Sequence, residues 1–339
     1  MKKQIPILFV FLLLCCHVAS GQDIHFTQFY ATPQTLNPAL TGVSEGTYRA
    51  TAIYRNQWSA VSIPYVTYGG SFDIRILQNK LKKDIFGIGI NLNADKSGTG
   101  KLFFMQVIGT IAYNKALDKE GKHYIGLGIQ GGYVQKGIKY NLLSFPTQFN
   151  GTDFDLGLSN NESFTASNTS YVDLNAGLLW HSQFGEKIRA FCGFSAYHLN
   201  RPKETFLGSD NKISMRLVAH GGVKVKASEN IYVTPSFIFQ FQNKAKEILF
   251  GTGVEYHTDV KNIPMIFGLG GWYRLKDAGS VTALVEIKRI RLGLAYDINS
   301  SKLKPASNNR GGFEIALTYV GLIGGAKALK PIQVPCPML

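Results

Sequence analysis

Two serine–histidine pairs are the residues of this sequence best suited to catalysis, because a serine beside a histidine can serve as a nucleophile with its general base. The pairs are Ser195 with His198 and Ser214 with His220. On a regular β-strand, positions three apart face opposite sides, and positions six apart are separated by roughly 20 Å. Neither pair can therefore touch within one strand, although a contact across strands stays open. We predict that the protein is not an enzyme.

Patterns that bind metals or cofactors are not found in the sequence. It has no HExxH or CxxC motif and no glycine-rich loop between a strand and a helix. Cys192 falls within a strand-like run and Cys336 lies near the last residue, which is not a disulfide framework. The histidines after residue 21 stand apart from one another: His25, His123, His181, His198, His220 and His257. We predict neither a metal site nor a cofactor.

The elements that would position these side chains are short runs of alternating apolar and polar residues. In one run, Leu292, Leu294, Tyr296 and Ile298 share one face, while Arg291, Gly293, Asp297 and Asn299 share the other. About fourteen such runs follow one another: 46–55, 65–77, 84–94, 101–115, 122–138, 171–182, 187–198, 212–226, 229–242, 247–257, 261–274, 278–288, 289–299 and 310–321. Hairpin after hairpin with this period is typical of an all-β transmembrane antiparallel barrel of the outer-membrane type. In hydrocarbon such a sheet has to close, because no backbone amide can be left unpaired.

The connections between these runs differ in length in a regular way. The even-numbered ones, such as 78–83 and 183–186, are short, whereas 139–170 and 199–211 are long odd-numbered ones. Outer-membrane barrels have short periplasmic turns and longer extracellular loops. We therefore predict an even number of strands and two periplasmic termini.

The first 21 residues have the basic start, apolar stretch and small-residue end of a secretion signal. Its removal would lower the net charge from +14 by the two units of Lys2 and Lys3. The basic residues are scattered over turns and strand ends, which argues against a nucleic-acid-binding protein. We predict four parts: a signal peptide (1–21), an N-terminal periplasmic or plug segment (22–45), the outer-membrane barrel (46–321) and a C-terminal periplasmic tail (322–339).

Several segments resemble the PorP/SprF family of type IX secretion outer-membrane proteins. They are residues 23–31 (DIHFTQFYA), 36–42 (LNPALTG), 54–58 (YRNQW), 197–202 (YHLNRP) and 296–315, which includes YDINS and GGFEI. The resemblance implies a non-enzymatic barrel in the outer membrane. It also implies that the protein helps secrete, deliver or anchor a large surface protein, such as a gliding adhesin. The expected partners are type IX secretion components, that secreted protein and outer-membrane lipid, and no nucleic acid.

The sequence leaves one alternative open, a passive solute channel of the porin type, because it does not tell whether the lumen is open or plugged. We predict that Gln22–Gly42 packs against the barrel interior or its periplasmic rim. We also predict that residues of the family segments bind a partner, namely Phe26, Gln28, Phe29, Tyr30, Asn37, Pro38, His198, Asn200 and Pro202.

Overall fold

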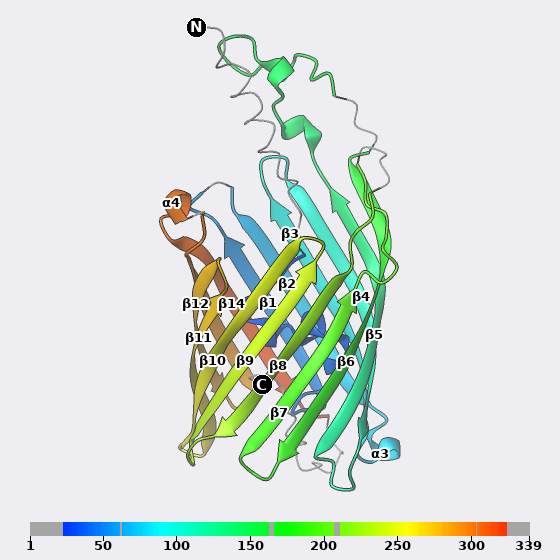
Figure 1. Cartoon of the computed structure of the whole chain (residues 1–339), viewed down its shortest axis with the longest axis vertical. Helices are drawn as coiled ribbons and strands as arrows, with labels where there is room; N and C mark the ends of the chain where they lie inside the picture. Colours follow the sequence, from blue (N-terminus) through cyan, green and yellow to red (C-terminus); the bar gives the residue numbers. More distant parts are fainter. Residues whose placement is uncertain (1–22, 62, 163–165, 207–210, 303, 324–339) are drawn as a thin grey trace, which may run out of the picture.

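The chain forms a closed antiparallel β-barrel. A computed structural model describes residues 23–61, 63–162, 166–206, 211–302 and 304–323. Within them, fourteen strands follow one another around the barrel in chain order, and β1 closes it by pairing with β14 (Figure 1). The predicted fold class and strand number are confirmed. The predicted signal peptide and residues 324–339 of the predicted tail lie outside the described residues.

The strands are long enough to cross a bilayer, for which about 9–11 residues are needed. They are β1 Tyr48–Gln57, β2 Tyr65–Ile76, β3 Ile85–Ser97, β4 Leu102–Ala116, β5 His123–Gly137, β6 Asn168–Phe184, β7 Ile188–Tyr197, β8 Arg216–Lys226, β9 Ile231–Gln242, β10 Ala245–Val260, β11 Ile263–Arg274, β12 Ala278–Ile287, β13 Ile290–Asn299 and β14 Arg310–Gly321. The prediction for β8 was wrong at its start. It placed the strand from residue 212, but Lys212 and Ile213 pair with Lys203 and Pro202 of the preceding loop.

The pleat separates an apolar outside from a polar inside, as predicted. Leu294, Tyr296 and Ile298 of β13 are exposed on the outer face, whereas Asp297 and Asn299 of the same strand are buried in the lumen. Successive side chains of a strand point to opposite faces, so the outer residues contact lipid and the inner residues face the lumen.

The two ends of the barrel differ. We call the end with the connections 77–84, 117–122, 185–187, 227–230, 261–262 and 288–289 the turn end, and the opposite end the loop end. The loop end carries the long connections 138–167 and 198–215. Among the residues that the structure describes, the helices are single turns: η1 Phe29–Ala31, α2 Pro33–Leu36, η2 Pro38–Leu40, α3 Gln78–Leu81, η3 Tyr140–Leu142, η4 Pro146–Gln148 and α4 Lys304–Ser307. No helix in the described part of the chain is long and apolar enough to cross a membrane.

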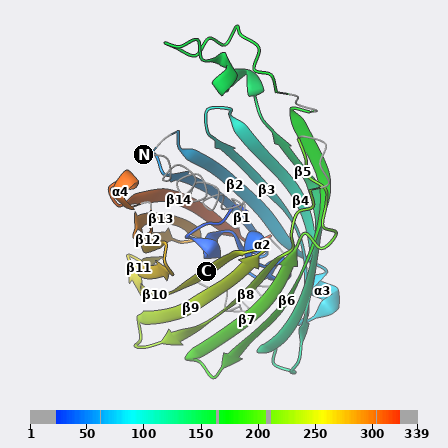
Figure 2. The same cartoon turned by 45° about the horizontal axis from the view of Figure 1, so that its top comes forward.

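Residues 23–46, which we call the luminal segment, lie inside the barrel before the chain enters β1 (Figure 2). The apolar side chains of this segment form one core with inward-facing apolar residues of the wall, among them Tyr124, Leu179, Val218 and Trp272. Phe29, for example, packs edge-on against Trp272 at 5.2 Å between ring centres. The core of the molecule is therefore the contact between this segment and the strands around it.

Candidate functional site

The shape of the luminal segment follows from its prolines and Asn37. Pro33 and Pro38 stand at the first position of α2 and η2, where the fixed φ of proline fits a helical turn. Asn37 lies between the two turns, and its side-chain oxygen accepts a hydrogen bond from the amide of Ala39 at 2.9 Å. Its side-chain nitrogen donates to the carbonyl of Leu178 at 2.8 Å. The same residue therefore shapes the segment and ties it to β6.

Two glycines of the wall make room for this turn. A Cβ atom on Gly128 of β5 would lie 2.4 Å from the backbone nitrogen of Ala39, and a Cβ on Gly177 of β6 would lie 2.1 Å from the side-chain oxygen of Asn37. Real Cβ atoms do not approach other heavy atoms so closely, so the segment can rest here only because both residues lack a side chain. Residues 36–39 thus fit a seat that is built into the wall.

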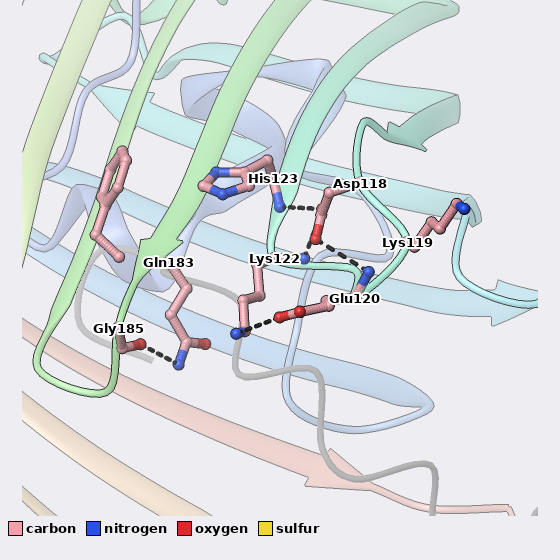
Figure 3. A pocket seen from close by; sticks show the side chains of 8 residues that line it. Asp118, Lys119, Glu120, Lys122, His123, Gln183 and Gly185 are labelled. Atoms are coloured by element: carbon pink, nitrogen blue, oxygen red, sulfur yellow. Dashed lines mark hydrogen bonds and ion pairs between the residues drawn. The ribbon is translucent and has the colours of Figure 1, made fainter.

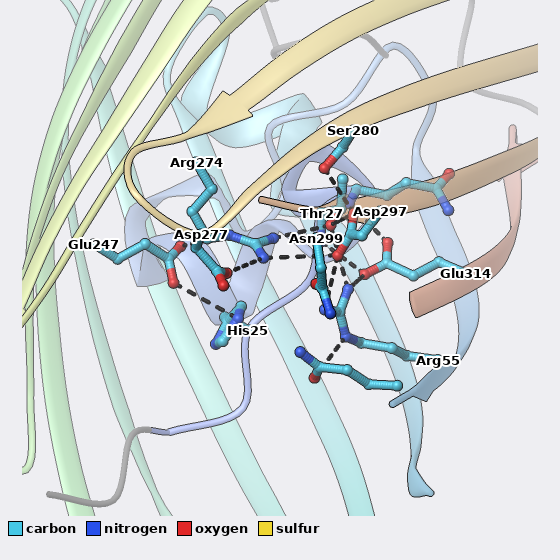
Figure 4. A network of polar contacts seen from close by, with 12 residues as sticks. His25, Thr27, Arg55, Glu247, Arg274, Asp277, Ser280, Asp297, Asn299 and Glu314 are labelled. Carbon is cyan, nitrogen blue, oxygen red and sulfur yellow. Dashed lines mark hydrogen bonds and ion pairs between the residues drawn. The ribbon is translucent and has the colours of Figure 1, made fainter. Parts of the chain in front are cut away.

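A cluster of buried charges holds the segment near its start (Figure 4). Both carboxylate oxygens of Glu314 on β14 accept backbone hydrogen bonds, from Thr27 at 2.7 Å and from Gln28 at 2.9 Å. The Thr27 hydroxyl donates to Asp297 of β13 at 2.7 Å. Arg55 of β1 pairs with both acids. We call Arg55, Asp297 and Glu314 the central clasp.

Arg274 of β11 joins the central clasp from the opposite side. Its guanidinium donates to the Thr27 hydroxyl at 3.0 Å and lies 3.6 Å from Asp297. His25 is placed beside Glu247, at 3.6 Å (Figure 4). Charges this deeply buried need partners, because an unpaired buried charge would strongly destabilise the folded protein. The clasp therefore uses the segment's own amides and hydroxyl to complete its hydrogen bonding.

A second cluster holds the segment at the turn end. Arg49 of β1 forms a bidentate ion pair with Asp73 of β2, with hydrogen bonds of 2.9 and 3.1 Å. Arg49 also donates to the carbonyl of Leu40 at 3.2 Å, and Asp73 accepts the amide of Gly42 at 2.8 Å. Arg75 donates to the carbonyl of Gly42 at 2.6 Å. The segment is thus hydrogen-bonded to the wall up to its entry into β1.

A third cluster, which we call the loop-end latch, holds the first described residue. The two ring nitrogens of His198 lie 2.8 Å from Asp173 of β6 and 2.8 Å from Asp23. Arg216 at the start of β8 lies 3.2 Å from Asp23. Burial alone would lower the pKa of the His198 imidazole, but its bonds to Asp173 and Asp23 outweigh burial and raise the pKa to about 9. Burial likewise opposes ionisation of Asp23, yet Arg216 and His198 hold the pKa of its carboxyl well below its ordinary value.

Most of the residues predicted to bind a partner are brought together here. Six of them belong to the luminal segment and are buried against the wall: Phe26, Gln28, Phe29, Tyr30, Asn37 and Pro38. His198 and Pro202 are buried at the loop end. Asn200 is exposed, although its side chain bonds the backbone of Val172 and Leu174. In this structure the partner of the buried residues is the barrel itself.

One expectation about side-chain direction was wrong. Ser195 and His198 were predicted to face opposite sides, but both face the lumen. The reason is that β7 ends at Tyr197, and His198 adopts a left-handed φ of 58°, so the alternation stops before it. The two side chains have separate partners, since the Ser195 hydroxyl donates to the carbonyl of Leu36 at 2.8 Å.

Sequence reasoning missed the wall residues that hold the segment: Arg49, Arg55, Asp73, Asp173, Arg274 and Glu314. In the sequence, such a residue can be recognised as a charged residue at an inward position of a run whose outward positions are apolar. Asp297 and Glu314 could be assigned to the inner face in this way. Their pairing with residues 27 and 28 requires the closed barrel.

The cavities beside the luminal segment that its residues line are small. Three of them have volumes of about 30, 10 and 10 Å³, which is room for single water molecules.

A larger hollow of about 470 Å³ lies outside the lumen, between the turns 117–122 and 185–187 (Figure 3). There the Asp118 carboxylate accepts the backbone amides of Glu120, Lys122 and His123, as expected for a residue that stabilises a turn.

Comparisons with known proteins agree with this architecture. The solved structure of the toluene transporter TbuX of Ralstonia pickettii is similar over 85% of this chain and 92% of its own, with a TM-score of 0.50 and 12% identity. The toluene transporter TodX of P. putida has a TM-score of 0.50 and 11% identity over 84% of this chain and 92% of its own. At identities this low, the structural similarity shows a shared outer-membrane barrel fold and nothing about a shared function. No curated protein matches the chain.

The sequence itself matches a family described as type IX secretion system membrane protein PorP/SprF, over residues 18–319. This range includes the luminal segment and nearly all of the barrel. Family and fold are those of a secretion or transport membrane protein. The chain belongs to the PorP/SprF family of type IX secretion system membrane proteins.

Proposed function

We propose that this protein is a non-enzymatic, closed barrel of the outer membrane that helps the type IX secretion system secrete, deliver or anchor one large surface protein, such as a gliding adhesin. Membership of the PorP/SprF family supports a role in this system. The barrel then acts as a membrane-embedded binding component. It requires neither an active site nor a cofactor.

The observation that carries the proposal is the occupied lumen. The luminal segment is bonded to the wall at three levels, by Asp23 at the loop end, Thr27 in the middle and Gly42 at the turn end. A passive channel needs a continuous water-filled path. A lumen filled by its own chain and fixed by buried ion pairs favours a scaffold over the alternative of a solute channel.

The same geometry supports an orientation. If the short connections face the periplasm, as in bacterial outer-membrane barrels, the loop end faces the cell exterior. The luminal segment then runs from Asp23, near the exterior, to the periplasmic start of β1. The residues before Asp23 lie outside the described part of the chain, so the periplasmic position of both termini stays a prediction.

Purification of the intact protein from its native outer membrane, in mild detergent, tests the proposal. We expect one large secreted protein and type IX components to co-purify with it in fixed ratio. An unrelated outer-membrane barrel of the same cells serves as the control for nonspecific capture. A preparation that contains the barrel alone, and that conducts ions in a planar bilayer, would favour the solute channel.

A further inference from the structure

The long connection 138–167 carries a folded unit. Figure 1 shows it projecting beyond the strand ends at the loop end, above all other described connections. We call residues 140–162 the loop tip. It contains the single turns η3 and η4 and an isolated bridge between Phe149 and Phe154.

The loop tip is held in shape by its own polar groups. The side chain of Gln148 is buried, accepts the amide of Phe145 at 3.0 Å and donates to the carbonyl of Leu158 at 2.9 Å. The Thr147 hydroxyl reaches across to the carbonyl of Asn160 at 2.8 Å. These bonds join the two arms of the loop, so the tip presents a fixed surface.

That surface is apolar. Phe149, Phe154, Leu156 and Leu158, which we call the tip cluster, are 48%, 52%, 55% and 44% exposed. The two phenylalanine rings contact each other at 5.3 Å between centres. Apolar groups on the outer face of the strands are covered by lipid, but the tip cluster stands away from the bilayer. Clustered exposed apolar side chains on a soluble surface mark interaction sites.

The charge of the loop tip narrows the class of partner. Residues 140–162 contain Asp153, Asp155 and Glu162 and no Lys or Arg, in a chain of net charge +14. Peripheral contact with a membrane surface uses basic residues around an apolar group, so an acidic tip does not fit lipid. It also fits a second copy of this tip poorly, because like charges would meet. A protein surface with an apolar recess and a basic rim is complementary to it.

We propose that the loop tip is the surface by which the barrel holds its secreted protein, with the tip cluster inserted into an apolar recess of that protein and Asp153 and Glu162 facing Lys or Arg at its rim. This inference rests on the proposed function. It adds the binding surface and the chemistry of the partner's site. Because the tip is already folded, binding does not have to order it, which favours affinity.

The test compares variants of the full-length protein, expressed in its native cells and purified in mild detergent. The test variants are the double variant Phe154→Ser/Leu156→Ser and the single variant Asp153→Lys. Leu199→Ser is the matched control, since Leu199 is 43% exposed in the other long connection of the loop end. The readout is the amount of large secreted protein retained per barrel. Heat-modifiable migration of each barrel verifies its folding.

We expect the double variant to retain at least about tenfold less secreted protein, because central apolar anchors dominate binding free energy. Asp153→Lys should lower retention less and make it less sensitive to salt. Leu199→Ser should retain wild-type amounts.

If the double variant and the wild type retain equal amounts, the loop tip is not the binding surface, and the proposed function survives. If the wild type itself retains no secreted protein, both proposals fail. A change in self-association of the barrel caused by the tip variants would also overturn the inference.

Discussion

The luminal segment and the loop tip are alike in secondary structure and opposite in placement. Both are short non-strand stretches that use single helical turns. In the luminal segment, backbone groups bond charged wall residues such as Glu314 and Asp73. In the loop tip, backbone groups bond the tip's own Gln148 and Asn150. The luminal segment is therefore part of the barrel's core, whereas the loop tip is an exposed surface shaped largely by its own side chains.

The seat of the luminal segment gives the largest expected effect. Gly128→Leu places a side chain where the backbone of Ala39 now lies, so we expect the segment to leave its seat and the variant to conduct ions in a planar bilayer. A displaced segment also loses its bonds to the central clasp, so the cost in stability should be at least the roughly 3–5 kcal/mol of breaking one buried pair.

Gly271→Leu is the matched control for this variant, because no atom lies within 4 Å of a Cβ at Gly271. The control should remain as closed as the wild type. If Gly128→Leu were also closed, the seat would not be needed to keep the segment in the lumen.

The central clasp should contribute nearly as much to the stability of the barrel. Glu314→Gln removes a buried carboxylate that accepts two backbone amides and pairs with Arg55. Breaking a buried pair from one side typically costs about 3–5 kcal/mol, which urea unfolding of the barrel in detergent would measure. Glu229→Gln, at an exposed turn, should change stability by less than about 0.5 kcal/mol. Equal effects of the two variants would mean that the clasp does not hold the segment.

The loop-end latch predicts a pH dependence. The pKa of His198 is raised in the folded protein, from an ordinary 6.5 to about 9. Its stabilising contribution is therefore complete below the ordinary pKa and is lost as the pH rises through about 9. We expect wild type to exceed His198→Gln in stability by about 2–3 kcal/mol near pH 6, and by much less near pH 10.

Subtracting the two unfolding curves at each pH removes the contribution of other titrating groups such as His25. The pKa of His25 is lowered, chiefly by burial. A stability difference that stays constant across this pH range would exclude a charged His198 between the two aspartates.

The loop tip should give the smallest effect on the barrel itself. Phe154→Ser alters an exposed side chain of the loop tip, so we expect a change in unfolding free energy below about 0.5 kcal/mol and no ion conduction. A large loss of stability would show that the tip belongs to the same cooperative unit as the luminal segment.

The barrel could be predicted from the sequence because the information is local. A period of two is visible within each strand, and the short turns at one end set the parity of the strand count. Two predictions about the strands were wrong because of local backbone contacts and conformation that the alternation does not show. The start of β8 was misplaced because Ile213 bonds the loop residue Pro202, and the direction of His198 was wrong because of its positive φ.

The site could be predicted only in part, because its contacts are distant in sequence. Prolines and Asn37 marked residues 22–45 as ordered and non-strand. Thr27, however, bonds a residue 287 positions away, and Asn37 bonds one 141 positions away. Such pairs depend on closure of the sheet, which brings β14 beside β1. Charges at inward strand positions were visible in the sequence, but nothing local assigned them to the amides of residues 27 and 28.

Hydrogen exchange on the full-length barrel in detergent, followed by mass spectrometry of peptides from residues 23–46, tests most directly whether the luminal segment is a fixed part of the core. We expect the amides of Thr27, Gln28 and Gly42 to exchange as slowly as those of the neighbouring strands, because Glu314 and Asp73 accept their hydrogen bonds. Exchange of these amides at the rate of an unstructured peptide would contradict it.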